Sequence, residues 1–284
     1  MSAVVQIAAR EPATLDLDAG PASRNGLAVL DLREASRLWR LCWTLSWLDI
    51  KLRYRGSVLG PFWLTLSTAV MVAAMGTLYA GLFKMDMRNY LPFLVLSLVL
   101  WGFLGSLVTE ACLAYTSAEG MIRSVRMPYT LYAARIVLRN VMVLAHNMVV
   151  VIAVFAIFGT WPGAEALLAI GGFAIWLLDA LALSVLLGAL CARYRDIPPI
   201  VGSILQMAFF VTPIIWKPEL AGPQRQWLLP FNPFFSLMDL VRAPLLGTLP
   251  TAMTLLSALL YSAALCGTAW WLFARVRGRI AYWV

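Results

Sequence analysis

Six stretches of this chain run for about 20 residues with few charges, which is the length that a helix needs to cross a lipid bilayer. Hydrophobic residues make up 62% of the 284 residues and charged residues only 13%. A soluble domain has about 45–50% apolar and about 25% charged residues, so we expect an all-α membrane protein with six transmembrane helices. The expected spans are residues 62–83, 90–109, 128–158, 166–192, 197–216 and 251–274.

Basic residues are spread unevenly between these spans. Six spans place both ends of the chain on one side, and 16 of the 22 Lys and Arg residues lie in the segments assigned to that side. Positively charged loops stay in the cytoplasm, so both termini are expected there, with the chain in the inner membrane of a bacterium. The net charge of +8 then reflects membrane topology, and no nucleic-acid partner is expected. Residues 1–32 are expected to form a disordered cytoplasmic tail.

Residues 33–60 join this tail to the first span, and their pattern predicts an amphipathic helix on the membrane surface. A transmembrane course is excluded because each central Arg or Lys costs about 2.5–3.5 kcal/mol in hydrocarbon. Tryptophan and basic residues both favour the headgroup layer of the cytoplasmic leaflet. One apolar stripe holds the tryptophans, Ile50 and Tyr54, and leucines form a second. An ordinary basic collar before the first span is the alternative. The expected interface residues are Trp39, Trp43, Trp47, Lys51, Arg53, Tyr54 and Arg55.

The connection 115–128, YTSAEGMIRSVRMP, has the pattern of a short cytoplasmic helix. Thr116 followed three residues later by Glu119 fits a capping box, and Pro128 limits the far end. Apolar and basic side chains then alternate along the helix, as expected for a docking surface, although a plain linker is the alternative. The residues expected on this surface are Thr116, Glu119, Met121, Ile122, Arg123, Val125 and Arg126.

The outer segment 217–250 is too apolar for a free loop and is broken by too many prolines to span the bilayer. We expect short helices that dip back into the outer leaflet, which is allowed where protein or a water-filled cavity covers the irregular backbone. Aromatic rings at mid-span or in this segment are candidates to line a path, where a flat ring lets the CH face of a sugar slide. These channel or gate candidates are Tyr79, Trp101, Phe209, Phe210, Phe231, Phe234 and Phe235.

Four polar residues are expected at membrane depth, where an ionisable group indicates a partner or a water-filled path. Glu110 and Arg139 flank the 115–128 connection on adjacent helices, so they are expected to pair with each other or to line the path. His146 is either an interhelical hydrogen bonder or a proton relay. For Asp179, a helix–helix hydrogen bond and a pore position remain equally open.

Signatures of catalysis are absent from the sequence. It contains no phosphate-binding loop of the G-x-x-x-x-G-K-[ST] type, a single histidine and four widely scattered cysteines. An acid–base or metal site would have to be built almost without imidazole. We therefore expect neither catalysis nor a cofactor in this chain.

Five segments, in this order, resemble the permease subunit of ABC-2 type polysaccharide exporters over residues 33–284. The segments are DIKLRYRGSVLGPFW (49–63), IRSVRMP (122–128), RYRDI (193–197), TPIIW (212–216) and NPFFSLMDLVRAPLLG (232–247). The resemblance implies a six-helix ABC-2 transmembrane domain over 61–284, an interface helix over 33–60 and a cytoplasmic coupling helix between Thr116 and Arg126. Periplasmic re-entrant gate helices follow the fifth span.

The resemblance also implies partners. The permease would form a homodimer and bind two copies of a separate cytoplasmic ABC ATPase, which holds the ATP and Mg. Its cargo would be a polyprenyl- or lipid-linked polysaccharide such as O-antigen, capsule or teichoic acid. An ABC-2 permease for a drug or small lipid is the main alternative. A secondary transporter, for which inverted repeats would be expected, and a membrane-embedded glycan-modifying enzyme are the others.

Overall fold

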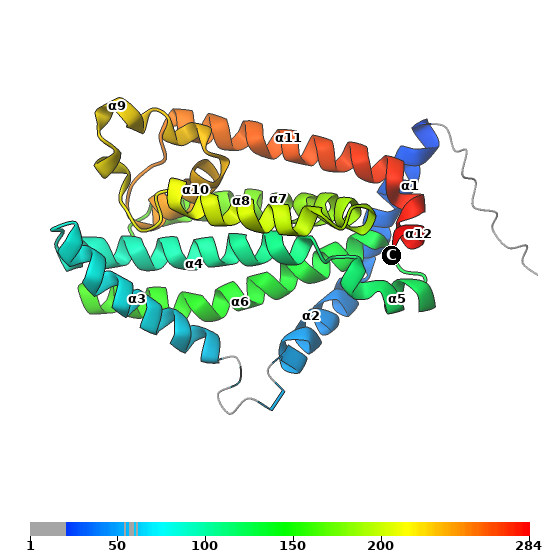
Figure 1. The fold of residues 1–284 in the computed structure, drawn as a ribbon, viewed down its shortest axis with the longest axis horizontal. Helices are drawn as coiled ribbons and strands as arrows, with labels where there is room; N and C mark the ends of the chain where they lie inside the picture. The colour runs from blue at the N-terminus through cyan, green and yellow to red at the C-terminus, as the bar shows by residue number, and fades with distance from the viewer. Residues whose placement is uncertain (1–20, 54, 57–59, 61) are drawn as a thin grey trace, which may run out of the picture.

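The computed structural model describes the chain except for residues 1–20, 54, 57–59 and 61, together with the side chains of 21–23. All regular structure in this part is helical, and the long helices lie side by side in an elongated bundle (Figure 1). The α-helices and the short 3-10 helices (η) are α1 Pro21–Arg37, α2 Trp39–Arg53, α3 Phe62–Leu82, α4 Met87–Ala111, η1 Thr116–Ala118, α5 Glu119–Ser124, α6 Tyr129–Phe158, α7 Ala166–Arg193, α8 Ile197–Val211, η2 Pro218–Ala221, α9 Pro223–Gln226, η3 Leu229–Phe231, α10 Pro233–Leu245, α11 Ala252–Val276, η4 Arg277–Arg279 and α12 Ile280–Trp283.

Five helical stretches in the described chain are long and apolar enough to cross a membrane: α3, α4, α6, α7 and the stretch that begins with α11. They coincide with five of the six expected spans. The remaining span, expected over 197–216, is a 15-residue apolar helix, α8, which ends at Val211. At 1.5 Å per residue α8 is about 22 Å long, shorter than the roughly 30 Å hydrocarbon layer. The prediction of six full-length spans is therefore confirmed only in part.

Helix α4 forms the centre of the bundle. It lies against α3 and α6 on one side and against α7, α8 and α10 on the other (Figure 1). Every residue from Tyr90 to Leu100 is buried, because this stretch is apolar on all faces and so can be surrounded by other helices.

Helices α7 and α10 cross at unusually short range. A Cβ atom added to Gly172 of α7 would lie 2.6 Å from the carbonyl oxygen of Leu240 in α10, so only glycine fits at this position. One turn further along α7, the indole Nε1 of Trp176 donates to the Leu237 carbonyl at 2.7 Å. These two contacts fix α10 against the membrane-spanning bundle.

The N-terminal segment differs from the expectation for residues 1–32. Residues 21–37 form helix α1, which packs against α6 and α11, and residues 1–20 lie outside the described chain. Asp31 of α1 is fully buried and accepts hydrogen bonds from the backbone N–H groups of Tyr129 and Thr130 at 3.0 and 2.9 Å. Arg277 pairs with the same carboxylate at 2.8 Å. The first turn of α6 is thus capped by α1, since its own N-cap residue, Pro128, makes no side-chain cap bond.

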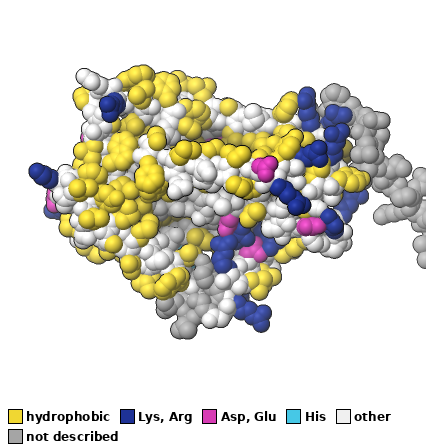
Figure 2. All heavy atoms as spheres, viewed as in Figure 1, with side chains coloured by type: hydrophobic (Ala, Val, Ile, Leu, Met, Phe, Trp, Pro, Cys, Tyr) yellow, Lys and Arg dark blue, Asp and Glu magenta, His cyan; other side chains and the backbone are white. Residues whose placement is uncertain are grey.

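The two ends of the bundle differ in composition. Helices α1, α5 and α12 lie at one end, and α9 lies with the α3–α4 turn at the other (Figure 1). Lys and Arg side chains gather at the α1–α5 end of the face seen in Figure 2, whereas apolar side chains cover much of the rest.

Replacing Asp31 tests whether α1 is an integral part of the fold. Asp31→Ala should lower the free energy of unfolding by about 2–4 kcal/mol, because it uncaps α6 and leaves Arg277 without its carboxylate. Asp31→Asn, which retains one oxygen acceptor, should cost less. Chemical unfolding of the purified protein in mixed micelles measures both. The control is Glu34→Ala on the exposed face of α1, and equal stability of Asp31→Ala and Glu34→Ala would refute the assignment.

Candidate functional site

Helix α2 turns its large apolar side chains away from the bundle. Trp39, Trp43 and Trp47 are 61%, 51% and 42% exposed, and the face against α6 carries small residues such as Cys42 and Ser46. A helix with one apolar face free and the opposite face on protein is the arrangement expected at a membrane surface.

Among the other expected interface residues, Lys51, Arg53 and Arg55 are exposed. Ile50, which the helical wheel groups with the tryptophans, is buried instead, because it lies at the edge of the stripe that faces α6. Tyr54 lies outside the described residues.

A cluster of charged and polar side chains joins α2 to α4 and α6. Arg139 is its centre: it donates to Glu110 at 2.7 Å and to Asp49 at 3.1 Å. The pairing of Glu110 with Arg139, one of the two readings of the sequence, is thereby confirmed. The members of this interfacial charge cluster are Asp49, Arg53, Glu110, Arg135, Arg139 and Asn140.

The remaining members complete the hydrogen bonding of the two carboxylates. Arg135 forms a bidentate ion pair with Asp49, in which Nε donates to Oδ2 at 2.7 Å and Nη2 donates to Oδ1. Glu110 also accepts from Asn140 at 2.6 Å and from Arg53 at 2.7 Å. Multiple charge-assisted bonds of this kind compensate the loss of solvation of buried carboxylates. Of this cluster, the sequence predicted only the Glu110–Arg139 pair. The Asp49–Arg135 pair was not predicted, because these two residues are separated by 86 residues in the sequence.

The connection after α4 forms η1 and α5, as the expected short helix, but without the predicted capping box. Neither helix has a side-chain hydrogen bond at its N-cap, and Glu119 pairs instead with Arg123 at 2.8 Å. A 3-10 turn at Thr116 moves the start of α5 to Glu119, so these residues no longer occupy the cap and third positions.

The exposed surface of α5 and the residues after it is smaller than expected. Met121 and Ile122 are half-buried against the main hydrophobic core, whereas Val125 is 52% exposed and Arg126 is exposed beside it. Beneath this segment, burial raises the pKa of the Tyr115 phenol, so the ring serves as a neutral packing group.

Four of the seven channel or gate candidates form one aromatic cluster, made by Trp101, Phe209, Phe210 and Phe234. The ring of Trp101 lies 5.8 Å from that of Phe209 and 5.4 Å from that of Phe234, and Phe210 lies 5.4 Å from Phe209. These are ordinary distances for interacting aromatic pairs. The cluster joins α4, α8 and the start of α10.

The other three candidates lie elsewhere. Tyr79 stacks on Phe83 at 5.7 Å, and Phe231 lies 6.1 Å from Trp227. Phe235, next to Phe234 in sequence, is buried on a different face of α10.

The 217–250 segment contains the short helices that its sequence predicts, η2, α9, η3 and α10, and a neighbouring motif holds it in place. Asn232 caps α10 and donates to the hydroxyl of Thr212 at 2.9 Å. Tyr90 donates to the carbonyl of Ile215 at 2.6 Å. Two of the sequence motifs noted above, TPIIW and NPFFSLMDLVRAPLLG, therefore bind each other, which accounts for the irregular backbone after α8.

Arg242 of α10 is fully buried, and its sequence position gave no sign of this role. It donates to the Pro213 carbonyl at 2.6 Å and to the Ser97 hydroxyl at 3.1 Å, and it pairs with Asp239 at 3.0 Å. Its guanidinium also lies 4.8 Å from the Phe93 ring, a cation–π distance. Only an arginine fork offers donors in so many directions, so one side chain joins α10 to α4 and to the end of α8.

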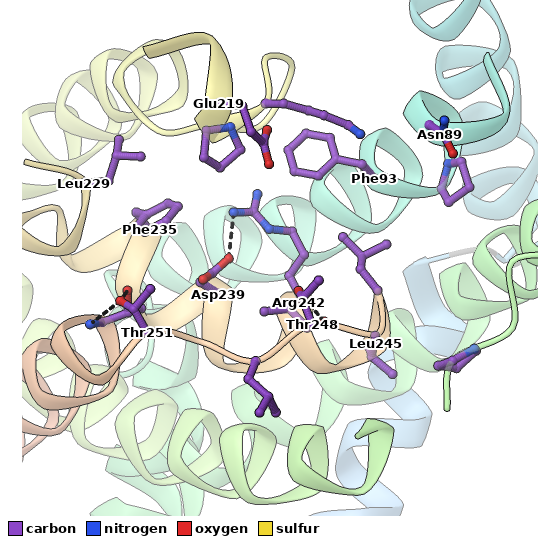
Figure 3. Close-up of a pocket in the computed structure, with 18 of the residues that line it drawn as sticks. Asn89, Phe93, Glu219, Leu229, Phe235, Asp239, Arg242, Leu245, Thr248 and Thr251 are labelled. Carbon is purple, nitrogen blue, oxygen red and sulfur yellow. Dashed lines mark hydrogen bonds and ion pairs between the residues drawn. The ribbon is translucent and has the colours of Figure 1, made fainter. Parts of the chain in front are cut away.

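A polar cavity of about 710 Å³ lies above Arg242, at the α9 end of the bundle. In Figure 3, Arg242 and Asp239 rise into it from α10, Glu219 points toward them from η2, and Phe93 enters from α4. Lys217, the residue that precedes η2, places its ammonium group over the same Phe93 ring. The cavity thus has charged groups of both signs and an aromatic wall.

The last two polar residues expected at membrane depth differ: the Asp179 side chain joins two helices, whereas the His146 ring bonds within its own helix, so the interhelical reading of His146 is not confirmed. Asp179 of α7 accepts from Ser262 of α11 at 2.7 Å, so the helix–helix reading of this residue is the one that the structure supports. His146 of α6 contacts the Met142 carbonyl through Nδ1 at 2.8 Å, and its own carbonyl accepts from Thr65 of α3.

Substitution of Arg242 tests its joining role. Arg242→Gln should lower the free energy of unfolding by about 3 kcal/mol, because Asp239 and the Pro213 carbonyl lose their donor. Arg242→Lys should recover only part of the loss, since an ammonium group has no planar fork. Chemical unfolding in mixed micelles measures the effect, with Arg225→Gln on the exposed helix α9 as the matched control. Equal stability of the Gln and Lys variants and the control would contradict the assignment.

Comparisons with known proteins agree with this architecture. The family model described as ABC-2 type transporter matches residues 40–246. The chain is 25% identical over 197 residues to the O-antigen export system permease protein RfbA of Myxococcus xanthus, covering 69% of this chain and 76% of that relative. It is 24% identical over 195 residues to a protein of the same description from Klebsiella pneumoniae, covering 67% of this chain and 74% of the relative. The chain therefore belongs to the ABC-2 type transporter family, as a multi-pass, non-catalytic membrane permease.

Proposed function

We propose that this chain exports a lipid-linked polysaccharide across the bacterial inner membrane, driven by a separate ABC ATPase. The observation that favours a polysaccharide cargo is the aromatic cluster of Trp101, Phe209, Phe210 and Phe234. Aromatic faces contact the CH faces of sugars without directional bonds that would hold a moving chain. The O-antigen export permeases among the relatives support the same class of cargo.

The exposed face of α4 next to Trp101 supports a path at this place. Gly102, Ser106 and Thr109 are exposed on a helix that is otherwise largely buried. These small and hydroxyl-bearing side chains suit a wet surface better than a lipid-facing one. A second copy of the chain would close the path. Helix α8, in which Leu205 is the one buried residue, would contribute to the same boundary. The proposed unit is a homodimer with two ATPase subunits.

The two ends of the bundle take different roles in this proposal. The α1–α5 end faces the cytoplasm with both termini, in keeping with its basic side chains, and α2 lies on the lipid headgroups through its tryptophans. The exposed residues Val125 and Arg126, with α5, form the surface that docks the ATPase, as a short helix does in a groove of its partner. The 217–250 segment, at the opposite end, forms the gate on the periplasmic side.

The coupling assignment predicts that a change at this surface separates the permease from its ATPase. Val125→Asp combined with Arg126→Glu should reduce co-purification of the cognate ABC ATPase at least tenfold, since a buried apolar contact and a charge contact are lost, together about 1.4 kcal/mol or more. Leu30→Asp, which changes a half-exposed leucine on α1, serves as the control at the same end. An unchanged yield of complex from the double variant would exclude this docking surface.

If the aromatic cluster lines the export path, export should be slower when rings of the cluster are replaced by alanine. Trp101→Ala with Phe209→Ala should lower the rate at which the glycan reaches the cell surface about two- to tenfold, because one ring contact contributes roughly 0.5–1.5 kcal/mol. Surface glycan is measured over time, together with the thermal stability of the purified variant. Trp271→Ala, an exposed ring on α11, is the control. A stable double variant that exports at the parental rate would refute the role of these rings, and normal surface glycan in cells without this chain would refute the function.

A further inference from the structure

We propose that the polar cavity between η2, α4 and α10 binds a short oligosaccharide segment of the exported glycan, as a site that each protomer carries within itself. This inference rests on the proposed function. The volume of the cavity, about 710 Å³, lies inside the roughly 300–1,000 Å³ range of small-molecule sites. The cavity lies on the other side of α10 from the aromatic cluster of the proposed path, because Phe235 lines it and Phe234 belongs to the cluster.

The walls of the cavity offer hydrogen-bonding groups of several kinds. Carboxylates accept hydrogen bonds, ammonium and guanidinium groups donate them, and amides and hydroxyls do both. A sugar carries several hydroxyl groups, each of which is a donor and an acceptor, so it can use all of these together. The polar residues that line the cavity beside Arg242 and Asp239 include Arg88, Asn89, Lys217, Glu219, Gln226 and Thr251.

Three basic side chains, Arg88, Lys217 and Arg242, and two carboxylates, Asp239 and Glu219, line the cavity. This mixture suits a polyhydroxylated ligand better than an acyl chain. Arg242 and Asp239 pair with each other, and the Glu219 carboxylate points toward them from the opposite wall (Figure 3). A hydrocarbon chain would leave all these charges without solvent. A neutral or mixed-charge sugar segment can hydrogen-bond to both signs and avoids this penalty.

Flat apolar groups complete the site. Trp161, which is 63% exposed, and its neighbour Pro162 belong to the lining, whereas the ring of Phe93 is buried beneath Arg242 and Lys217. Trp161 and Pro162 provide surfaces for the CH faces of the sugar rings.

Helix α10 places this site close to the proposed path. Phe234 belongs to the aromatic cluster, whereas its neighbour Phe235 lines the cavity and lies 5.7 Å from the Arg242 guanidinium. The cavity and the cluster therefore lie on two faces of the same helix. A sugar segment held in the cavity would therefore contact α10, the helix that also forms a wall of the proposed export path.

Cysteine protection in living cells tests this site with the native glycan as the probe. Gln226→Cys places a thiol in the cavity wall, and Gln224→Cys places one on the same short helix but outside the cavity lining. Each variant is labelled with a membrane-impermeant maleimide in two strains, one that makes the lipid-linked polysaccharide and one that lacks its first glycosyltransferase. The parent chain, whose native cysteines are buried or half-buried, gives the background.

Occupancy of the cavity predicts that Gln226→Cys is labelled several-fold more slowly in the glycan-producing strain, while Gln224→Cys is labelled equally in both. Equal labelling of Gln226→Cys in the two strains, or equal protection of both positions, would overturn the inference. Surface glycan is measured in the same cells. If export depends on this chain but the cavity is not protected, the oligosaccharide site is wrong and the proposed function stands; if export does not depend on the chain, the proposed function fails.

A second set of variants tests the chemistry of the site. Lys217→Ala with Glu219→Ala, added to Gln226→Cys, should abolish the protection, because the ammonium donor and the carboxylate acceptor on the η2 wall are both removed. Arg225→Gln, an exposed change on α9, should leave the protection intact. Protection that persists in the charge-removed variant, with its thermal stability unchanged, would exclude these residues as ligands of the sugar.

Discussion

Three arginines in the described part of this bundle bind carboxylates from other turns or helices, and these pairs fix how the helices meet. Arg139 binds carboxylates from both α2 and α4, Arg277 binds the buried Asp31 of α1, and Arg242 binds Asp239 and a backbone carbonyl at the end of α8. Removing one partner of such a pair costs far more than the pair contributes as a whole. Helix positions at these three places are therefore specified by charge, whereas the middle of the bundle depends on apolar packing around α4.

Helix α4 connects two of these places. Glu110 lies near one end of it, in the interfacial charge cluster, and Ser97 and Phe93 contact Arg242 toward the other. Between them the helix is largely buried, so it has neighbours on nearly every face and little freedom to bend. The structure thereby joins the surface helix α2 and the 217–250 segment through one rigid element that contacts both.

The length and composition of the apolar segments predicted most of the fold, because a span is a local property of about 20 residues. The errors occur where a distant partner decides the local structure. The helix expected through 216 ends at Val211, because Thr212 and Pro213 bind Asn232 and Arg242. Likewise, α1 is held against the bundle by Asp31, whose partners Tyr129, Thr130 and Arg277 are distant in the sequence. At the candidate site, the sequence identified the Glu110–Arg139 pair and four rings of the aromatic cluster, but it missed Asp239 and Arg242, whose partners come from three separate segments.

The outward-facing tryptophans of α2 have a practical consequence for handling the protein. On the side of α2 that meets α6, Ile50 is buried beside the small residues Cys42 and Ser46. Contact with the bundle therefore contributes little apolar burial to this helix, and the surrounding amphiphile contributes the remainder. Harsh, short-chain detergents would detach α2 before the transmembrane bundle unfolds. A lipid nanodisc surrounds its indole rings with lipid, so the choice of solubilising medium decides whether α2 stays in place against the bundle in a purified sample.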